Sequence, residues 1–84
     1  MHVEFLGIPR ERAGLSELQM EAETLGQALD ALAARFPRLR DLVTDGRLHP
    51  SLAASLNADL FISDPATRLT SDDRLLILSA DAGG

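Results

Sequence analysis

The chain has 84 residues, of which 45% are hydrophobic and 25% charged, and its formal net charge is −5. This composition is typical of a folded globular protein, and the length predicts a single domain over residues 1–84. The acidic balance argues against a nucleic-acid partner, because phosphate binding depends on Lys and Arg side chains.

The residue types that are missing from the chain exclude several kinds of covalent bond and reactive site. There is no cysteine, which removes disulfides, thiolate metal ligands and thiol nucleophiles. His2 and His49 lack a third ligand at metal spacing, so we expect no metal site. No run of 18 apolar residues and no signal-peptide pattern occurs, which predicts a cytoplasmic protein without a membrane partner.

The first part of the chain predicts two strands and a helix. Residues 2–8 read as a strand with Val3 and Phe5 on one face and with Leu6 and Ile8 on the other. Residues 9–14 read as a turn or short loop, and residues 17–22 alternate like a strand with one wet face. The two strands should form a hairpin.

The main helix begins at a capping box. Thr24 can accept a hydrogen bond from the backbone of Gln27, whose side chain reaches back. Pro37 ends the segment. Between Thr24 and Pro37, apolar residues recur at helical spacing and form one stripe: Leu25, Ala28, Leu29, Leu32, Ala33 and Phe36.

The second half predicts shorter elements. Residues 38–43 can add a helical turn, residues 52–57 and 60–62 are strand candidates, and residues 74–79 form a final strand with turns before it. The first and final strands are apolar on both faces at several positions, which places them centrally in the sheet.

Only one face of this sheet has a predicted cover. The helix should pack on Val3 and Phe5, on Leu18 and Met20, and on one alternate pair of the final strand, either Leu75/Ile77 or Leu76/Leu78. The opposite face would carry Leu6 and Ile8. Exposed apolar surface of this kind typically marks an interface, so we expect this face to bind a partner.

The last residues form a tail of small side chains, residues 79–84. Gly83 and Gly84 have no Cβ, so a partner enzyme could draw them into a narrow channel and reach the terminal carboxylate. Asp81 could pair with a basic group along that channel. The competing interpretation is an ordinary frayed terminus.

The order of elements, the length and the final Gly-Gly resemble the ubiquitin-like β-grasp sulfur carriers, and the small subunit of molybdopterin synthase is the nearest branch. The matching segments are Val3-Glu4-Phe5-Leu6, Arg10-Glu11-Arg12-Ala13-Gly14, Thr24 to Leu32 with Arg35-Phe36-Pro37, Leu56-Asn57-Ala58-Asp59, Ser71-Asp72-Asp73 and the final strand. The resemblance implies an α+β fold, in which a mixed sheet of four or five strands carries one main helix and a flexible tail.

This chain departs from that branch in three places. The branch usually ends in Pro-Pro-Val-Ser/Ala-Gly-Gly, whereas residues 79–82 here read Ser-Ala-Asp-Ala. The acidic turn is Ser71-Asp72-Asp73 instead of Gly-Asp-Glu, and residues 54–57 read Ala-Ser-Leu-Asn instead of Val-x-Val-Asn. These differences bear on the identity of the partner more than on the fold.

The resemblance also implies a reaction in which this chain is not catalytic alone and binds no cofactor. An adenylating enzyme of the ubiquitin-activating type would join the Gly84 carboxylate to AMP, using ATP and Mg²⁺. A persulfide from a sulfur-donor protein would then lead to a thiocarboxylate. The large subunit of molybdopterin synthase would receive the tail, with Asp81, Ala82 and Gly83 in its channel.

Three alternatives remain open at this point. The carrier could serve thiamin or tRNA thiolation instead of molybdopterin. The activated Gly84 could be attacked by a lysine amine on a target protein, which would make the chain a protein modifier. A non-catalytic interaction domain with the same fold is the third.

Overall fold

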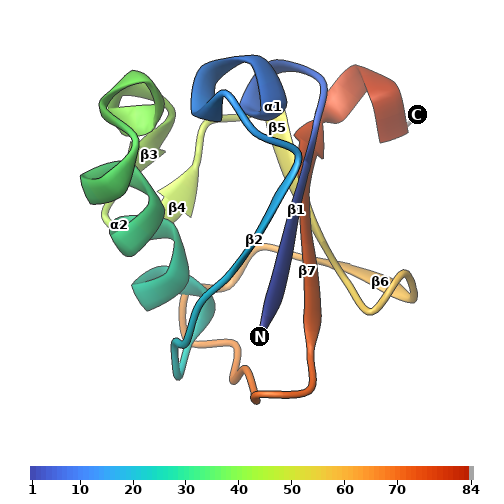
Figure 1. The fold of residues 1–84 in the computed structure, drawn as a ribbon. Helices are drawn as coiled ribbons and strands as arrows, with labels where there is room; N and C mark the ends of the chain where they lie inside the picture. Colours follow the sequence, from blue (N-terminus) through green and yellow to red (C-terminus); the bar gives the residue numbers. More distant parts are fainter. Residues whose placement is uncertain (84) are drawn as a thin grey trace.

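A computed structural model describes residues 1–83 of the chain (Figure 1). The helices are α1 (Ile8–Ala13), α2 (Leu25–Arg35) and the 3-10 helices η1 (Pro37–Leu42) and η2 (Ala80–Gly83). The strands are β1 (His2–Leu6), β2 (Glu17–Gln19), β3 (Val43–Thr44), β4 (Arg47–Leu48), β5 (Leu52–Leu56), β6 (Leu60–Ile62) and β7 (Arg74–Ser79).

Five strands form one mixed sheet in the order β2-β1-β7-β5-β6. β1 and β7 pair in parallel, with Phe5 opposite Ile77, and the other pairs are antiparallel. The two ends of the chain therefore supply adjacent strands, and β7 lies in the middle. The prediction that the first and final strands are central is confirmed, as is the expected α+β fold.

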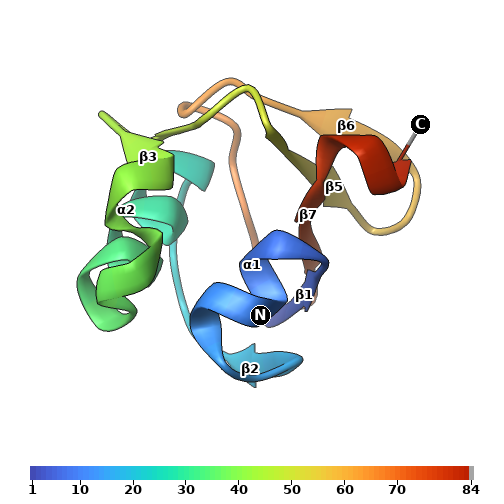
Figure 2. The same ribbon diagram turned by 90° about the horizontal axis from the view of Figure 1, so that it is seen from above.

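The helix α2 lies across one face of this sheet (Figures 1 and 2). The Thr24 hydroxyl accepts from the Gln27 N–H at 3.2 Å, and the Gln27 side chain accepts from the Glu23 N–H at 3.0 Å. The N–H groups of Leu25 and Gly26 are taken by the carbonyls of Thr67 and Pro65. The start of the helix is thus fixed by its own capping box and by the 65–67 loop.

The core lies between α2 and the sheet. It takes alternate residues of each strand, because side chains of a strand point to opposite faces in turn. Of the two pairs offered by β7, Leu75 and Ile77 face α2, and Leu18 and Met20 pack at its margin as expected. The core residues from the strands are Val3, Phe5, Leu52, Ala54, Leu75 and Ile77, and those from α2 are Leu25, Ala28, Leu29 and Leu32.

Three predicted boundaries are wrong. The second strand, predicted over residues 17–22, ends at Gln19. The first strand ends at Leu6, and the segment expected to be a loop is the helix α1, with Ile8 as its first residue. Pro9 in the first turn and Gly14 as a left-handed cap at φ 78° are ordinary start and stop signals of a helix. A helix of six residues is too short to show a periodic apolar stripe, and so the pattern did not reveal it.

The final strand covers residues 74–79 as predicted, so the first residue of the predicted tail belongs to the sheet. Ser79 is the last residue of β7, and the backbone of residues 80–83 forms the single 3-10 turn η2. Among the described residues, no helix has the length and apolar character needed to cross a membrane.

Candidate functional site

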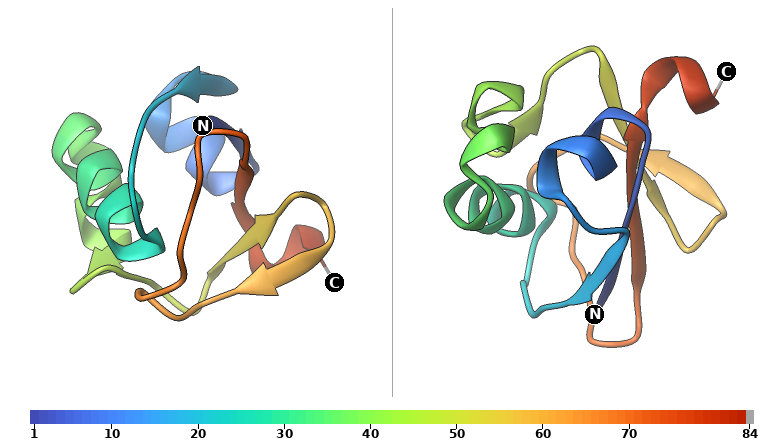
Figure 3. Two further views of the ribbon diagram at one scale, coloured as in Figure 1. Left: turned by 90° about the horizontal axis from the view of Figure 1, so that it is seen from below. Right: turned by 45° about the horizontal axis from the view of Figure 1, so that its top comes forward.

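The candidate site is the end of β7 and the tail that follows it. Because β7 is the central strand, the tail leaves from the best-supported element of the sheet. η2 lies on the side of β7 away from α2 (Figures 1 and 3). Asp81 is exposed. The predicted reactive residue, Gly84, lies outside the described residues, and for Ala82 and Gly83 only the backbone is described.

The start of the tail is joined to the end of β1. The Ser79 hydroxyl accepts a hydrogen bond from the Ile8 N–H at 2.8 Å, and so takes up one of the free donors at the start of α1. Gly7 makes this approach possible. A Cβ on Gly7 would overlap the Ser79 hydroxyl, and its φ of 74° is one that side chains disfavour.

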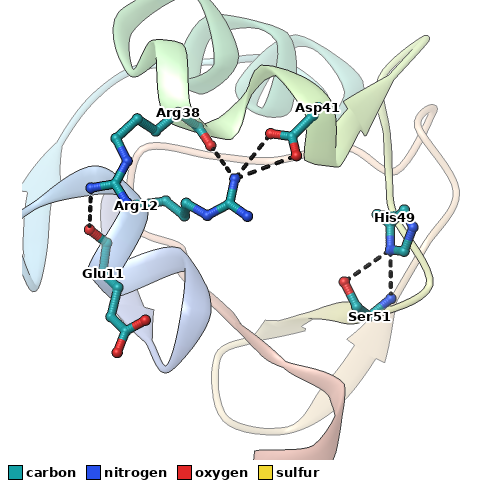
Figure 4. Close-up of polar contacts among 6 residues, drawn as sticks. All are labelled: Glu11, Arg12, Arg38, Asp41, His49 and Ser51. Carbon is teal, nitrogen blue, oxygen red and sulfur yellow. Dashed lines mark hydrogen bonds and ion pairs between the residues drawn. The ribbon is translucent and has the colours of Figure 1, made fainter.

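A second contact holds the next residue. The Ala80 N–H donates to the Ser51 carbonyl at 2.8 Å. Ser51 is fixed in turn by His49, whose Nδ1 accepts from the Ser51 N–H at 3.0 Å and lies 2.9 Å from its hydroxyl (Figure 4). We call Gly7, Ser51, Ser79 and Ala80 the tail root. They set the direction in which the chain leaves the sheet.

The helix α1 is itself anchored on its other side. Arg12 reaches η1, where its Nη1 donates to the Arg38 carbonyl at 2.9 Å and to the Asp41 carboxylate at 3.1 Å (Figure 4). Arg38 reaches back to the Glu11 carbonyl at 3.5 Å. These exposed contacts contribute little stability individually. Together they fix the position of α1, whose first N–H group donates to Ser79 of the tail root.

The sheet face away from α2, here called the open face, is only partly covered. On this face Leu6 is 43% exposed. Phe61 pairs with Ser55 and therefore points to the same face, and it is 61% exposed. Leu76 is half-buried, whereas Leu78, beside the tail root, is buried. Ile8 is 37% exposed, but it projects from α1 rather than from the strand.

A polar network closes the opposite end of the sheet. The Asn57 amide donates to Asp73 at 2.9 Å, and the Thr70 N–H donates to the other carboxylate oxygen at 2.8 Å. The side-chain oxygen of Asn57, Oδ1, accepts from the Arg74 backbone N–H at 2.8 Å. The hydrogen bonds from Asn57 and Thr70 hold the pKa of the Asp73 carboxyl below its ordinary value. This network is structural and joins the two turns that flank β5 and β7.

Sequence reasoning found the tail and the open face but missed the tail root. Ser79 and Ile8 are 71 positions apart, and Arg12 and Asp41 are 29 apart, so no local pattern links them. The one local signal was Gly7 directly before a helix that begins with a proline in its first turn.

A five-stranded mixed sheet, one long helix across it and a central last strand that runs into a Gly-Gly tail define a ubiquitin-like β-grasp protein of the sulfur-carrier type. The chain matches the model described as "ThiS family" over residues 3–84. It therefore belongs to that family of ubiquitin-like sulfur carriers and modifiers, whose members are small and not catalytic by themselves.

Solved structures with this fold come from archaea and bacteria. SAMP1 from Haloferax volcanii is 25% identical, with a TM-score of 0.74 over 100% of this chain and 98% of that one. CysO from Mycobacterium tuberculosis is 26% identical, with a TM-score of 0.72 over 94% and 97%. In the BexX/CysO complex from Amycolatopsis orientalis, the matched chain is 24% identical, with a TM-score of 0.77 over 99% and 98%. No curated protein sequence matches significantly.

Proposed function

We propose that this chain is a sulfur carrier for molybdopterin synthesis and that it carries the sulfur on the Gly84 carboxylate. The observation that carries the proposal is the course of β7: the central strand ends at Ser79, and small residues alone, apart from Asp81, follow it to the final Gly-Gly. Membership of the ThiS family supports the sulfur-carrier role.

The chemistry needs only a reachable carboxylate from this chain. A carboxylate oxygen attacks the α-phosphorus of ATP in a partner enzyme and displaces pyrophosphate, which leaves an acyl adenylate. A persulfide sulfur then attacks the acyl carbon and displaces AMP, and a thiol reductant cleaves the resulting acyl disulfide to give the thiocarboxylate. Activation thus divides one difficult substitution into easier steps. Mg²⁺ and the groups that neutralise phosphate charge belong to the partner, so this chain needs no cofactor of its own for the reaction.

The geometry suits delivery of the tail into such a partner. The tail root fixes residues up to Ala80, while η2 is a single 3-10 turn of four residues. A turn of this length has poor hydrogen-bond geometry and costs little to unwind. Once extended, residues 81–84 would span at most ~3.3–3.6 Å each. Asp81 would then meet a basic group at the mouth of the channel.

The test is intact-mass measurement of the protein purified from its native cells. We expect a fraction whose mass is raised by the exchange of one oxygen for sulfur, and we expect deletion of Gly84 to remove it. Incubation of this fraction with the large synthase subunit and the cyclic pterin precursor should yield molybdopterin. A thiocarboxylated protein that forms no molybdopterin would leave the carrier role standing and reject the pathway, in favour of thiamin or tRNA thiolation.

A second function is favoured by the similarity to SAMP1 from Haloferax volcanii. Another solved structure of that protein is described as a small archaeal modifier protein. In this role a target lysine amine attacks the activated Gly84. Trypsin cleaves after Arg74, so modified lysines would carry the branch 75–84, which digests of cell extract would reveal. If neither the branch nor the sulfur-shifted mass is found under any condition, both roles are excluded and an interaction domain remains.

A further inference from the structure

Three metal-ligating side chains meet on the open face where β1 pairs with β2. Glu4 and Glu17 lie directly opposite each other in the ladder, and His2 is two residues before Glu4 on the same face. His2 Nε2 is 3.1 Å from Glu4 Oε1 and 3.5 Å from Glu17 Oε2. One ligand atom from each residue lies within 4.8 Å of the others. His2 and Glu4 share a face of β1, and the third member, Glu17, comes from β2, so the sequence spacing does not show the complete set.

The charge balance at this point favours a cation. Like charges directly opposite in an antiparallel ladder are unfavourable. The groups beside the two carboxylates are the His2 imidazole and Arg74, whose Nη1 is 3.7 Å from Glu4 Oε1. The Arg74 side chain is 72% exposed and can move away, whereas His2 is held with only 20% of its side chain exposed. A divalent ion would compensate both carboxylates at once.

The other ring nitrogen of His2 faces the Gln19 side-chain amide, whose NH2 group is the nearer end and donates to it. Nδ1 lies 2.7 Å from the terminal amide of Gln19. Rotation of that amide presents its oxygen instead, which accepts the Nδ1 proton and leaves the Nε2 lone pair directed at the two carboxylates. Metal-bound histidines commonly donate their second N–H to such an acceptor, which fixes the ring orientation.

We propose that His2 Nε2, Glu4 and Glu17 form a zinc site, with water in the fourth position. One imidazole with two carboxylates is a ligand set that Zn²⁺ accepts, with ligand distances of about 2.0–2.2 Å. The present separations of 3.1 and 3.5 Å between ligand atoms are those of neighbouring corners of a tetrahedron of that size. The ion would tie the short edge strand β2 to β1. The site is independent of the tail and of the function proposed for it.

The test is a calorimetric titration of the chelator-treated full-length protein with zinc chloride. We expect one ion per chain, and at least tenfold weaker binding for both His2→Ala and Glu17→Gln. His49→Ala is the matched control, because His49 is the second histidine of the chain and lies beside the tail root, where it contacts Ser51. This variant should bind zinc as the parent does. Zinc at ten times its Kd should raise the Tm of the parent by roughly 6–11 °C.

The variants also separate the site from simpler explanations. A chelate of the N-terminal amine with His2 would survive Glu17→Gln, and a result of that kind overturns the proposal. Equal losses for His2→Ala and His49→Ala, or no saturable binding by the parent, overturn it as well.

Discussion

At the scale of single residues, the tail is positioned by one glycine and one hydroxyl. Gly7 turns the chain from β1 into α1 at a positive φ, and this leaves room for Ser79 to accept from the Ile8 N–H. The base of the tail is therefore held by residues from the other end of the chain. The composition of the tail alone does not contain this information.

Gly7→Ala should destabilise the protein by more than the cost of its backbone conformation. Gly14→Ala is the matched control, since Gly14 has nearly the same φ of 78° and nothing within 4 Å of an added Cβ. We expect a loss of roughly 1–2 kcal/mol for Gly14→Ala and a larger loss for Gly7→Ala, measured by urea unfolding. Ser79→Ala should recover part of the excess in the double mutant. Equal losses for the two glycine variants would show that Ser79 is not in contact with Gly7.

At the scale of elements, the turns that flank β5 and β7 are fastened to each other through Asn57 and Asp73. The segments concerned are two of those on which the family resemblance depends. They lie at the end of the sheet away from the tail, so their contribution is to the registry of β5 and β7 rather than to the chemistry.

Asp73 should contribute stability that depends on pH. Its folded-state pKa is lowered, so the contribution is present above the unfolded pKa of about 3.9 and is lost as pH falls through the folded value. Asp73→Asn should therefore cost on the order of 1 kcal/mol near neutral pH and much less near pH 2, by thermal unfolding at both. Asp72 is an exposed neighbour, and Asp72→Asn should leave the stability unchanged at both pH values. A cost for Asp73→Asn that is the same at both pH values would mean that the carboxylate charge is not involved.

At the scale of the whole molecule, α2 covers one face of the sheet and leaves the other partly open beside the tail. Exposed apolar side chains on one face are typical of an interface, and Leu6 on the open face is such a residue. The partner would hold the open face while the tail extends into its active site.

Leu6→Glu should raise the KM for adenylation by the cognate activating enzyme at least tenfold, because it places a charge within the contact. Its unfolding temperature should stay close to that of the parent, since Leu6 packs little in the folded chain. Leu60→Glu is the control: Leu60 is 52% exposed, but its pairing with Leu56 directs it to the opposite face. If Leu60→Glu has the same effect as Leu6→Glu, general acidity rather than the open face is responsible.

The sequence by itself determined the elements whose signals are local. The capping box at Thr24, the apolar stripe of α2 and the alternation in β1 and β7 each act over a few residues, and each predicted its element. These patterns predicted the central strands and the single long helix, and the β-grasp fold was predicted from the resemblance of their order to a known family. The short helix α1 was missed, although Pro9 and Gly14 marked its ends, and so were the two-residue strands β3 and β4 and the 3-10 turn η2.

Tertiary structure decided which distant residues meet. It chose Leu75 and Ile77 over Leu76 and Leu78 for the core, because the parallel pairing of β7 with β1 sets the register. It brought Ser79 to Ile8 and placed Glu17 opposite Glu4 beside His2. Such contacts depend on how strands from different parts of the chain are aligned, and that alignment results from packing the whole core rather than from any local run of residues.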